Sequence, residues 1–191
     1  MKRFFYTLLF SFSGIMLAAQ TPTSPFVEEG KTWYVLVSDH QMGSAWERYF
    51  GGVHYFIQGD TVIGSQVCKK VYSSRYVETT PIHHSDTTYY ASLYEEDNRV
   101  YLYAPDSDEA GLLYDFGLEK GESATFRLVD YLDARQAKDT VLTVTERAVV
   151  TGTLMGDASG AERTFVRLTL SGKSADGQAG GPTQWFAGVG D

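Results

Sequence analysis

The chain of 191 residues contains a single cysteine, Cys68, so no disulfide can form within it. Cys68 lies in a predicted strand, and no histidine stands close to it in the sequence to activate a thiolate. We therefore interpret Cys68 as a small buried hydrophobic residue. The absence of cysteine pairs excludes a disulfide-stapled scaffold, so the fold must rely on a hydrophobic core.

Helical periodicity is also absent. No segment shows a convincing helical period over twelve residues, and turn signals recur every eight to fifteen residues. β-branched and aromatic residues alternate with polar ones between these turns. The pattern predicts an all-β fold, either an antiparallel β-sandwich or an up-and-down β-barrel built from successive hairpins. The sequence leaves the choice between sandwich and barrel open.

Basic residues are scarce. The net charge is −8, and removal of Lys2 and Arg3 with an N-terminal signal peptide leaves 14 basic and 24 acidic residues, a net charge of −10. A surface this acidic repels phosphates, which makes nucleic acid and anionic lipid poor candidate partners, and we expect no nucleic acid partner.

The first twenty residues have the layout of that signal peptide: a basic start, an apolar run to Leu17, and Ala18-Ala19. No later segment resembles a membrane span, so we expect no integral membrane segment after cleavage. An exported chain of this length without disulfides is more typical of bacteria than of small extracellular animal domains. We therefore expect a bacterial protein that is secreted or held in the cell envelope, in the periplasm or on the outer surface.

Recognisable catalytic motifs are missing. The sequence contains no G-x-S-x-G, S-x-x-K or H-E-x-x-H. Gly172-Lys173-Ser174 resembles the end of a phosphate loop, but Arg167 stands where the first glycine is required. Paired carboxylates for glycoside hydrolysis stay open, because distance in sequence does not fix distance in space. We predict no catalytic residue, no cofactor-binding residue and no cofactor.

Two clusters are weak metal candidates. His83, His84 and Asp86 share a polar segment, but adjacent histidines on a strand point to opposite faces, and no further ligand stands at a suitable spacing. Asp106 and Asp108 begin like a calcium loop that then lacks its remaining ligands. We therefore predict that metal is not part of the function.

The stretch Val53–Ser73 reads as a long hairpin. A turn at Gly64-Ser65 places Asp60 opposite Lys69 as a charge pair, and Ile57 opposite Tyr72. The alternative turn at Gly59-Asp60 would put glycine in mid-strand, so we interpret Gly59 as a bulge or kink.

Further strands are expected along the chain. A hairpin turning at Asp97-Asn98 pairs Glu96 with Arg99, and a third hairpin turns at 117–122. Residues 74–88 read as a polar loop, and 46–50 as a strand with a short helix over 41–50 as its rival. The other predicted strands are 31–37, 140–150, 163–170 and 184–189. We divide the chain into a signal peptide (1–20), a leader segment (21–30) and a single β domain (31–191).

The pieces GDTVIGSQVCKKVY, YASLYEEDNRVYLY, LLYDFGLEKGE and QWFAGVGD, in this order, resemble a recurring pattern in uncharacterised secreted β-rich proteins of Bacteroidota. The resemblance covers about residues 33–191. Gly64-Ser65 replaces a common Asn-Gly turn, and Cys68 stands where an aromatic residue is frequent. Relatives often continue into a sorting domain for type IX secretion, so the resemblance implies either a short member or a further C-terminal piece. It implies no activity.

The combined interpretation is a non-catalytic secreted or cell-envelope β domain, which acts as a binding or structural module for an unknown ligand or surface partner. Two alternatives stay open. The first is a barrel that holds a small apolar ligand, and the second is an extracytoplasmic hydrolase acting on glycan or peptide.

Overall fold

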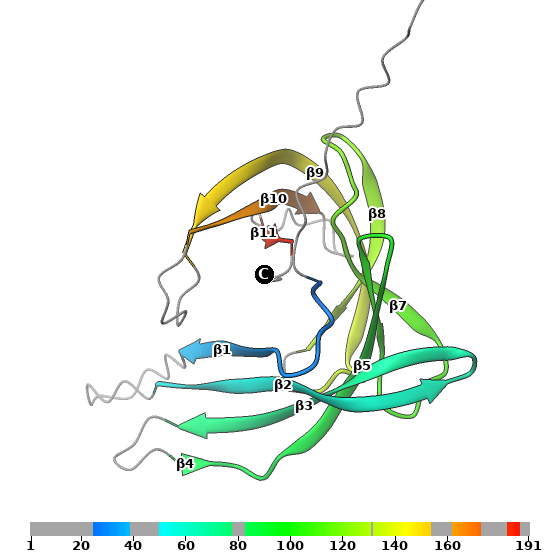
Figure 1. Ribbon diagram of the computed structural model, residues 1–191, viewed down its shortest axis with the longest axis vertical. Coiled ribbons are helices and arrows are strands. Elements are labelled where there is room, and N and C mark those ends of the chain that lie inside the picture. The colour runs from blue at the N-terminus through cyan, green and yellow to red at the C-terminus, as the bar shows by residue number, and fades with distance from the viewer. Residues whose placement is uncertain are drawn as a thin grey trace, which may run out of the picture.

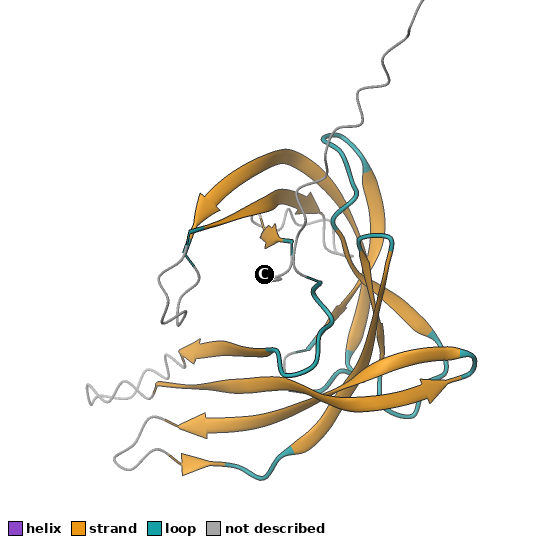
Figure 2. Cartoon of the chain, in the orientation of Figure 1, coloured by secondary structure: helices purple, strands orange, loops and turns teal. Residues whose placement is uncertain are grey.

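The computed structural model describes residues 25–38, 50–77, 83–130, 132–153, 162–172 and 183–187. All regular structure in these ranges is β-strand, as Figure 2 shows. The strands are β1 (Thr32–Ser38), β2 (Phe50–Ile63), β3 (Gln66–Val77), β4 (His83–His84), β5 (Thr88–Glu96), β6 (Arg99–Tyr103), β7 (Ala110–Asp115), β8 (Ser123–Val129), β9 (Ala137–Gly152), β10 (Arg163–Gly172) and β11 (Thr183–Phe186).

These strands form two antiparallel sheets. The larger has the order β1-β2-β3-β5-β6-β7, with the short β4 also paired to β3, and the smaller has the order β11-β10-β9-β8. The sheets curl around a shared interior as an open half-barrel (Figure 1). The predicted all-β antiparallel fold is confirmed, and most neighbouring strands are consecutive in the chain, as expected for successive hairpins.

The central hairpin has the predicted register near its turn. Asp60 faces Lys69, and their side chains form an ion pair of 2.6 Å. Gly64 adopts a φ of +60°, which a non-glycine residue would rarely tolerate. Farther from the turn the prediction was wrong by one residue, because Ile57 faces Val71. The cause is a bulge at Gly59, with a φ of +76°, which inserts one extra residue into β2.

The second hairpin agrees with its prediction throughout. Glu96 pairs with Arg99, and the same register continues with the Tyr94–Tyr101 and Leu93–Leu102 pairs. Asp97 and Asn98 have φ values of +50° and +62°. Two consecutive residues with positive φ form a tight hairpin turn, and the twist of this turn matches that of the flanking strands.

The predicted third hairpin was wrong. β7 pairs with β6, and β8 pairs with β9, so the segment between them passes from one sheet to the other. Phe116 and Leu118 in this connection are buried in the core. Their carbonyl oxygens accept hydrogen bonds from Arg147 Nη1 at 2.8 and 3.0 Å. Phe116 and Leu118 thus anchor the connection to the core, while Gly117 and residues 119–122 stay exposed.

The expectation of a polar loop over 74–88 was also wrong. β3 continues to Val77 along β2, and β4 then pairs with β3, with His84 opposite Tyr76. Polar side chains do not end a strand whose backbone groups have a partner on each side. The predicted strand at 46–50 and its helical rival lie outside the described residues except for Phe50, which begins β2.

The core lies between the two sheets and contains side chains from both. Trp185 of β11 packs edge-on against Tyr114 and Phe126, with ring centroids 4.9 and 4.8 Å apart. Phe26, which precedes β1, is only 4% exposed and packs on Trp33 and Tyr114 at 5.2 and 5.1 Å. Aromatic rings therefore fill the interior as a packed core.

Residues 25–30, which the sequence analysis assigns to a leader segment, are held by polar contacts as well. The carboxylate of Glu29 accepts a hydrogen bond from the backbone N–H of Gly59 at 2.9 Å and an ion pair from Lys69 Nζ at 3.2 Å. The backbone hydrogen bond from Gly59, followed by the bond from Lys69, lowers the pKa of Glu29. Val27 N–H donates to Glu95 Oε2 at 2.9 Å. These contacts fix the segment against β2, β3 and β5.

Candidate binding face

The first predicted metal cluster is divided between a strand and the loop after it. His83 and His84 occupy adjacent positions of β4. Asp86 follows in the connection to β5 and is exposed. In the described part of the chain, no group of three His, Cys, Asp or Glu side chains converges as metal ligands would.

The second candidate cluster contains Asp106 and Asp108, and both are exposed. Asp106 adopts a φ of +64°, and its carboxylate pairs with Arg135 at 3.0 Å. The Asp106 carboxylate is thus bound by a guanidinium from the segment before β9. Cys68 is 1% exposed, and burial raises the pKa of its thiol. Its interpretation as a small buried residue is confirmed.

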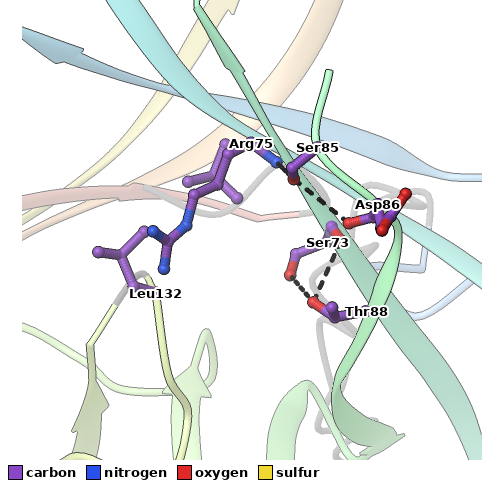
Figure 3. A pocket seen from close by; sticks show the side chains of 7 residues that line it. Ser73, Arg75, Ser85, Asp86, Thr88 and Leu132 are labelled. Carbon is purple, nitrogen blue, oxygen red and sulfur yellow. Dashed lines mark hydrogen bonds between the residues drawn. The ribbon is translucent and has the colours of Figure 1, made fainter. Parts of the chain in front are cut away.

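A hollow of about 340 Å³ opens on the concave side of the larger sheet (Figure 3). Its hydroxyl groups bridge β3 to the start of β5: Ser73 Oγ lies 3.4 Å from Thr88 Oγ1, and Ser85 Oγ accepts from the backbone N–H of Arg75 at 2.9 Å. The residues that line it are Val53, Ser73, Arg75, Ser85, Asp86, Thr88 and Leu132.

The opposite, outward side of the same sheet carries an unusual set of side chains. Antiparallel sheets with one face on the core usually present polar residues on the other. Here aromatic residues alternate with the core residues along five strands, which gives what we call the outer aromatic face. Its members are Tyr34 (β1), His54 and Phe56 (β2), Tyr72 and Tyr76 (β3), Tyr89 and Tyr94 (β5), and Tyr101 and Tyr103 (β6).

Neighbouring rings of this face touch from strand to strand. Tyr34 stacks on His54 with centroids 4.4 Å apart, and Phe56 stacks on Tyr72 at 5.7 Å. Tyr72 meets Tyr89 at 6.0 Å in an edge-to-face contact. Such cross-strand aromatic pairs stabilise the sheet by about 0.2–1 kcal/mol each. The contacts form a ladder from the edge strand β1 to β5.

A second group continues the face onto β6. The hydroxyl of Tyr89 lies 2.8 Å from Ser92 Oγ, and Ser92 faces Tyr103. Tyr94 stacks on Tyr101 at 4.7 Å and contacts Tyr103 at 5.9 Å. Burial raises the pKa of the Tyr94 hydroxyl. The ring contacts of the face therefore extend onto β6.

Exposure is concentrated at the two ends of the ladder. Tyr34 is 60% exposed and Tyr89 is 40% exposed, whereas the rings between them are half-buried. His54 covers one face of Tyr34, and Tyr72 meets Tyr89 edge-to-face. The two end rings therefore offer the largest accessible aromatic surface.

Gly52 has a specific role beneath this face. A Cβ atom built on Gly52 would lie 2.3 Å from the carbonyl oxygen of Val35 and 2.9 Å from the ring of Tyr76. Only glycine therefore lets the Tyr76 ring lie across β2. An aromatic ring that covers a cross-strand glycine restores the packing that the missing side chain would have supplied.

This face was not anticipated in the sequence analysis. The available signal was the run from Val53 to Ile57, where large residues occupy every position. One sheet face cannot bury consecutive residues, because side chains alternate. Half of such a run must point away from the core.

Comparison of the chain with known protein families, with curated proteins and with solved structures finds no match in any of the three. In the described ranges, no helix is long and apolar enough to cross a membrane.

Proposed function

We propose that this chain is a non-catalytic binding module, secreted or held at the bacterial cell envelope, which binds neutral glycan chains through its outer aromatic face. The observation that carries the proposal is the ladder of ring contacts on the outward side of the larger sheet. The signal-peptide layout and the resemblance to secreted Bacteroidota proteins support the location.

Ring chemistry favours a sugar. The face of an aromatic ring carries negative potential, and the C–H groups on one side of a sugar ring are weak positive donors. Tyr34 and Tyr89 offer the most exposed rings for such stacking. Tyrosine hydroxyl groups at the ring edges can exchange hydrogen bonds with sugar hydroxyl groups.

The negative charge of the chain favours a neutral ligand on this face over a second copy of the chain or an anionic polymer. None of the nine side chains carries a formal charge at pH 7, with histidine counted as neutral, in a chain of net charge −8. A second copy of the chain would bring the same negative charge, which opposes face-to-face association. Anionic polymers are repelled for the same reason. A neutral glycan meets no such penalty.

Sedimentation with isolated bacterial envelopes tests the proposal. The wild-type protein is expected to sediment with the envelopes, and the double variant Tyr34→Ala/Tyr89→Ala is expected to stay in solution. The matched control is Val62→Ala/Val67→Ala, because these residues are 65% and 61% exposed at the tip of the central hairpin, away from the face. Sedimentation of the double variant at the wild-type level would refute the role of the face.

Pretreatment of the envelopes identifies the partner. Periodate cleaves the vicinal diols of sugars and is expected to abolish sedimentation, whereas protease treatment is expected to leave it unchanged. The opposite pattern would show that the face binds a protein, and the glycan assignment would be wrong.

A further inference from the structure

Arg75 stands apart from the other arginines. Within the described ranges, five arginines form ion pairs with carboxylates, and Arg163 has an interaction of its own. Arg75 is the remaining arginine of those ranges, and its guanidinium has no hydrogen-bond or ion-pair partner there. In a chain with 24 acidic residues, an arginine side chain without a carboxylate is an exception.

The guanidinium of Arg75 projects into the hollow on the concave side (Figure 3). Leu132 faces it from one side, and the hydroxyl groups of Ser73 and Thr88 lie on another. Asp86 lines the hollow as well, but its side chain points away from the guanidinium in this view. The lining therefore combines one guanidinium, three hydroxyl groups, one carboxylate that points away from the guanidinium, and the apolar side chains of Val53 and Leu132.

The hydroxyl groups of Ser73 and Thr88 can form further hydrogen bonds. Ser73 is 8% exposed, and its Oγ lies 3.4 Å from Thr88 Oγ1, which also lies 3.4 Å from the carbonyl oxygen of Ser73. Both distances are long beside the usual O–H···O separation of about 2.7–2.8 Å. A hydroxyl can donate one hydrogen bond and accept two, so a closer acceptor in the hollow would improve the bonding of both.

We infer that this hollow binds the carboxylate of a small ligand or chain end, with the Arg75 guanidinium as its anchor. The planar guanidinium matches a carboxylate in a two-bonded arrangement. A single cation beside Asp86 suits a singly charged group better than a doubly charged phosphate. This site is on the opposite side of the sheet from the outer aromatic face and does not depend on it.

The test is an NMR titration of the intact protein with glucuronate, followed through the backbone amides of Arg75, Ser85 and Thr88. Methyl glucoside serves as the uncharged probe and sulfate as a second anion. Arg75→Gln is expected to weaken glucuronate binding about 10- to 100-fold, the range for loss of hydrogen bonds to a charged group. Arg135→Gln removes the same charge from an exposed, carboxylate-paired arginine and is the matched control.

We expect saturable shifts of these amides with glucuronate, with an affinity that is unchanged in Arg135→Gln and weakened as stated in Arg75→Gln, and no shifts from methyl glucoside. Arg75→Lys keeps the charge without the planar fork and is expected to bind more weakly than wild type. Equal responses to glucuronate and sulfate would show a nonspecific anion effect and overturn the assignment. Absence of saturable shifts in the wild type, or wild-type affinity in Arg75→Gln, would overturn it as well.

Discussion

Replacement of Phe26 by alanine tests whether the segment before β1 is an integral part of the fold. Phe26 is 4% exposed, and its ring packs on Trp33 and Tyr114, so truncation removes most of a buried aromatic side chain. Buried Phe→Ala substitutions cost about 3–5 kcal/mol. We expect a loss of about 3 kcal/mol in the free energy of unfolding, the lower end of this range.

Urea unfolding followed by tryptophan fluorescence measures this loss, since Trp33 and Trp185 both report on the core. A matched control is Tyr34→Ala, an aromatic truncation at a residue that is 60% exposed, with an expected cost of about 1 kcal/mol or less. In thermal unfolding, a loss of 3 kcal/mol corresponds to a decrease in Tm of about 6–12 °C for a domain of this size. If Phe26→Ala costs no more than the control, the segment does not contribute to the core as described.

Two further predictions concern titratable groups. The pKa of Glu29 is lowered by the Gly59 backbone hydrogen bond and by Lys69, so its stabilisation is present above its unfolded pKa of about 4.3 and is lost as the pH falls through the lower folded value. The free energy of unfolding of the wild type should therefore exceed that of Glu29→Gln at neutral pH, and this difference should disappear as the pH falls. A difference that is unchanged at about pH 2 would contradict the contact. Burial raises the pKa of Cys68, which is 1% exposed, so iodoacetamide should alkylate it far more slowly in native buffer than in urea. Equal rates would mean that the thiol is accessible.

The sequence was informative where local chemistry determines the structure. The register of the central hairpin followed from Gly64 at the turn and from the opposite charges of Asp60 and Lys69. The bulge at Gly59 was expected, but its effect on the pairing of Ile57 was not, because a bulge shifts every pair beyond it. Local turn signals therefore predicted the hairpin up to its first irregularity.

Long-range arrangement was not predictable in the same way. The chain does turn between β7 and β8, where the signal at 117–122 predicts a turn. No local feature indicates, however, that β8 joins the second sheet or that Phe116 and Leu118 lie in the core. Alternation along the strands shows that two faces exist without showing which of them meets solvent. The outer aromatic face therefore became visible only once the pairing of β1 to β6 was known.

The central claim is that the outer aromatic face contacts sugar rings, and saturation-transfer difference NMR tests it most directly. Aromatic protons of the protein are saturated in the presence of soluble neutral polysaccharides such as xyloglucan and mixed-linkage β-glucan, and transfer to the sugar C–H protons is observed. We predict transfer for the wild type and for Val62→Ala/Val67→Ala, and its loss in Tyr34→Ala/Tyr89→Ala. Transfer of equal strength in the Tyr34/Tyr89 variant, or none from the wild type to any neutral polysaccharide, would contradict the account.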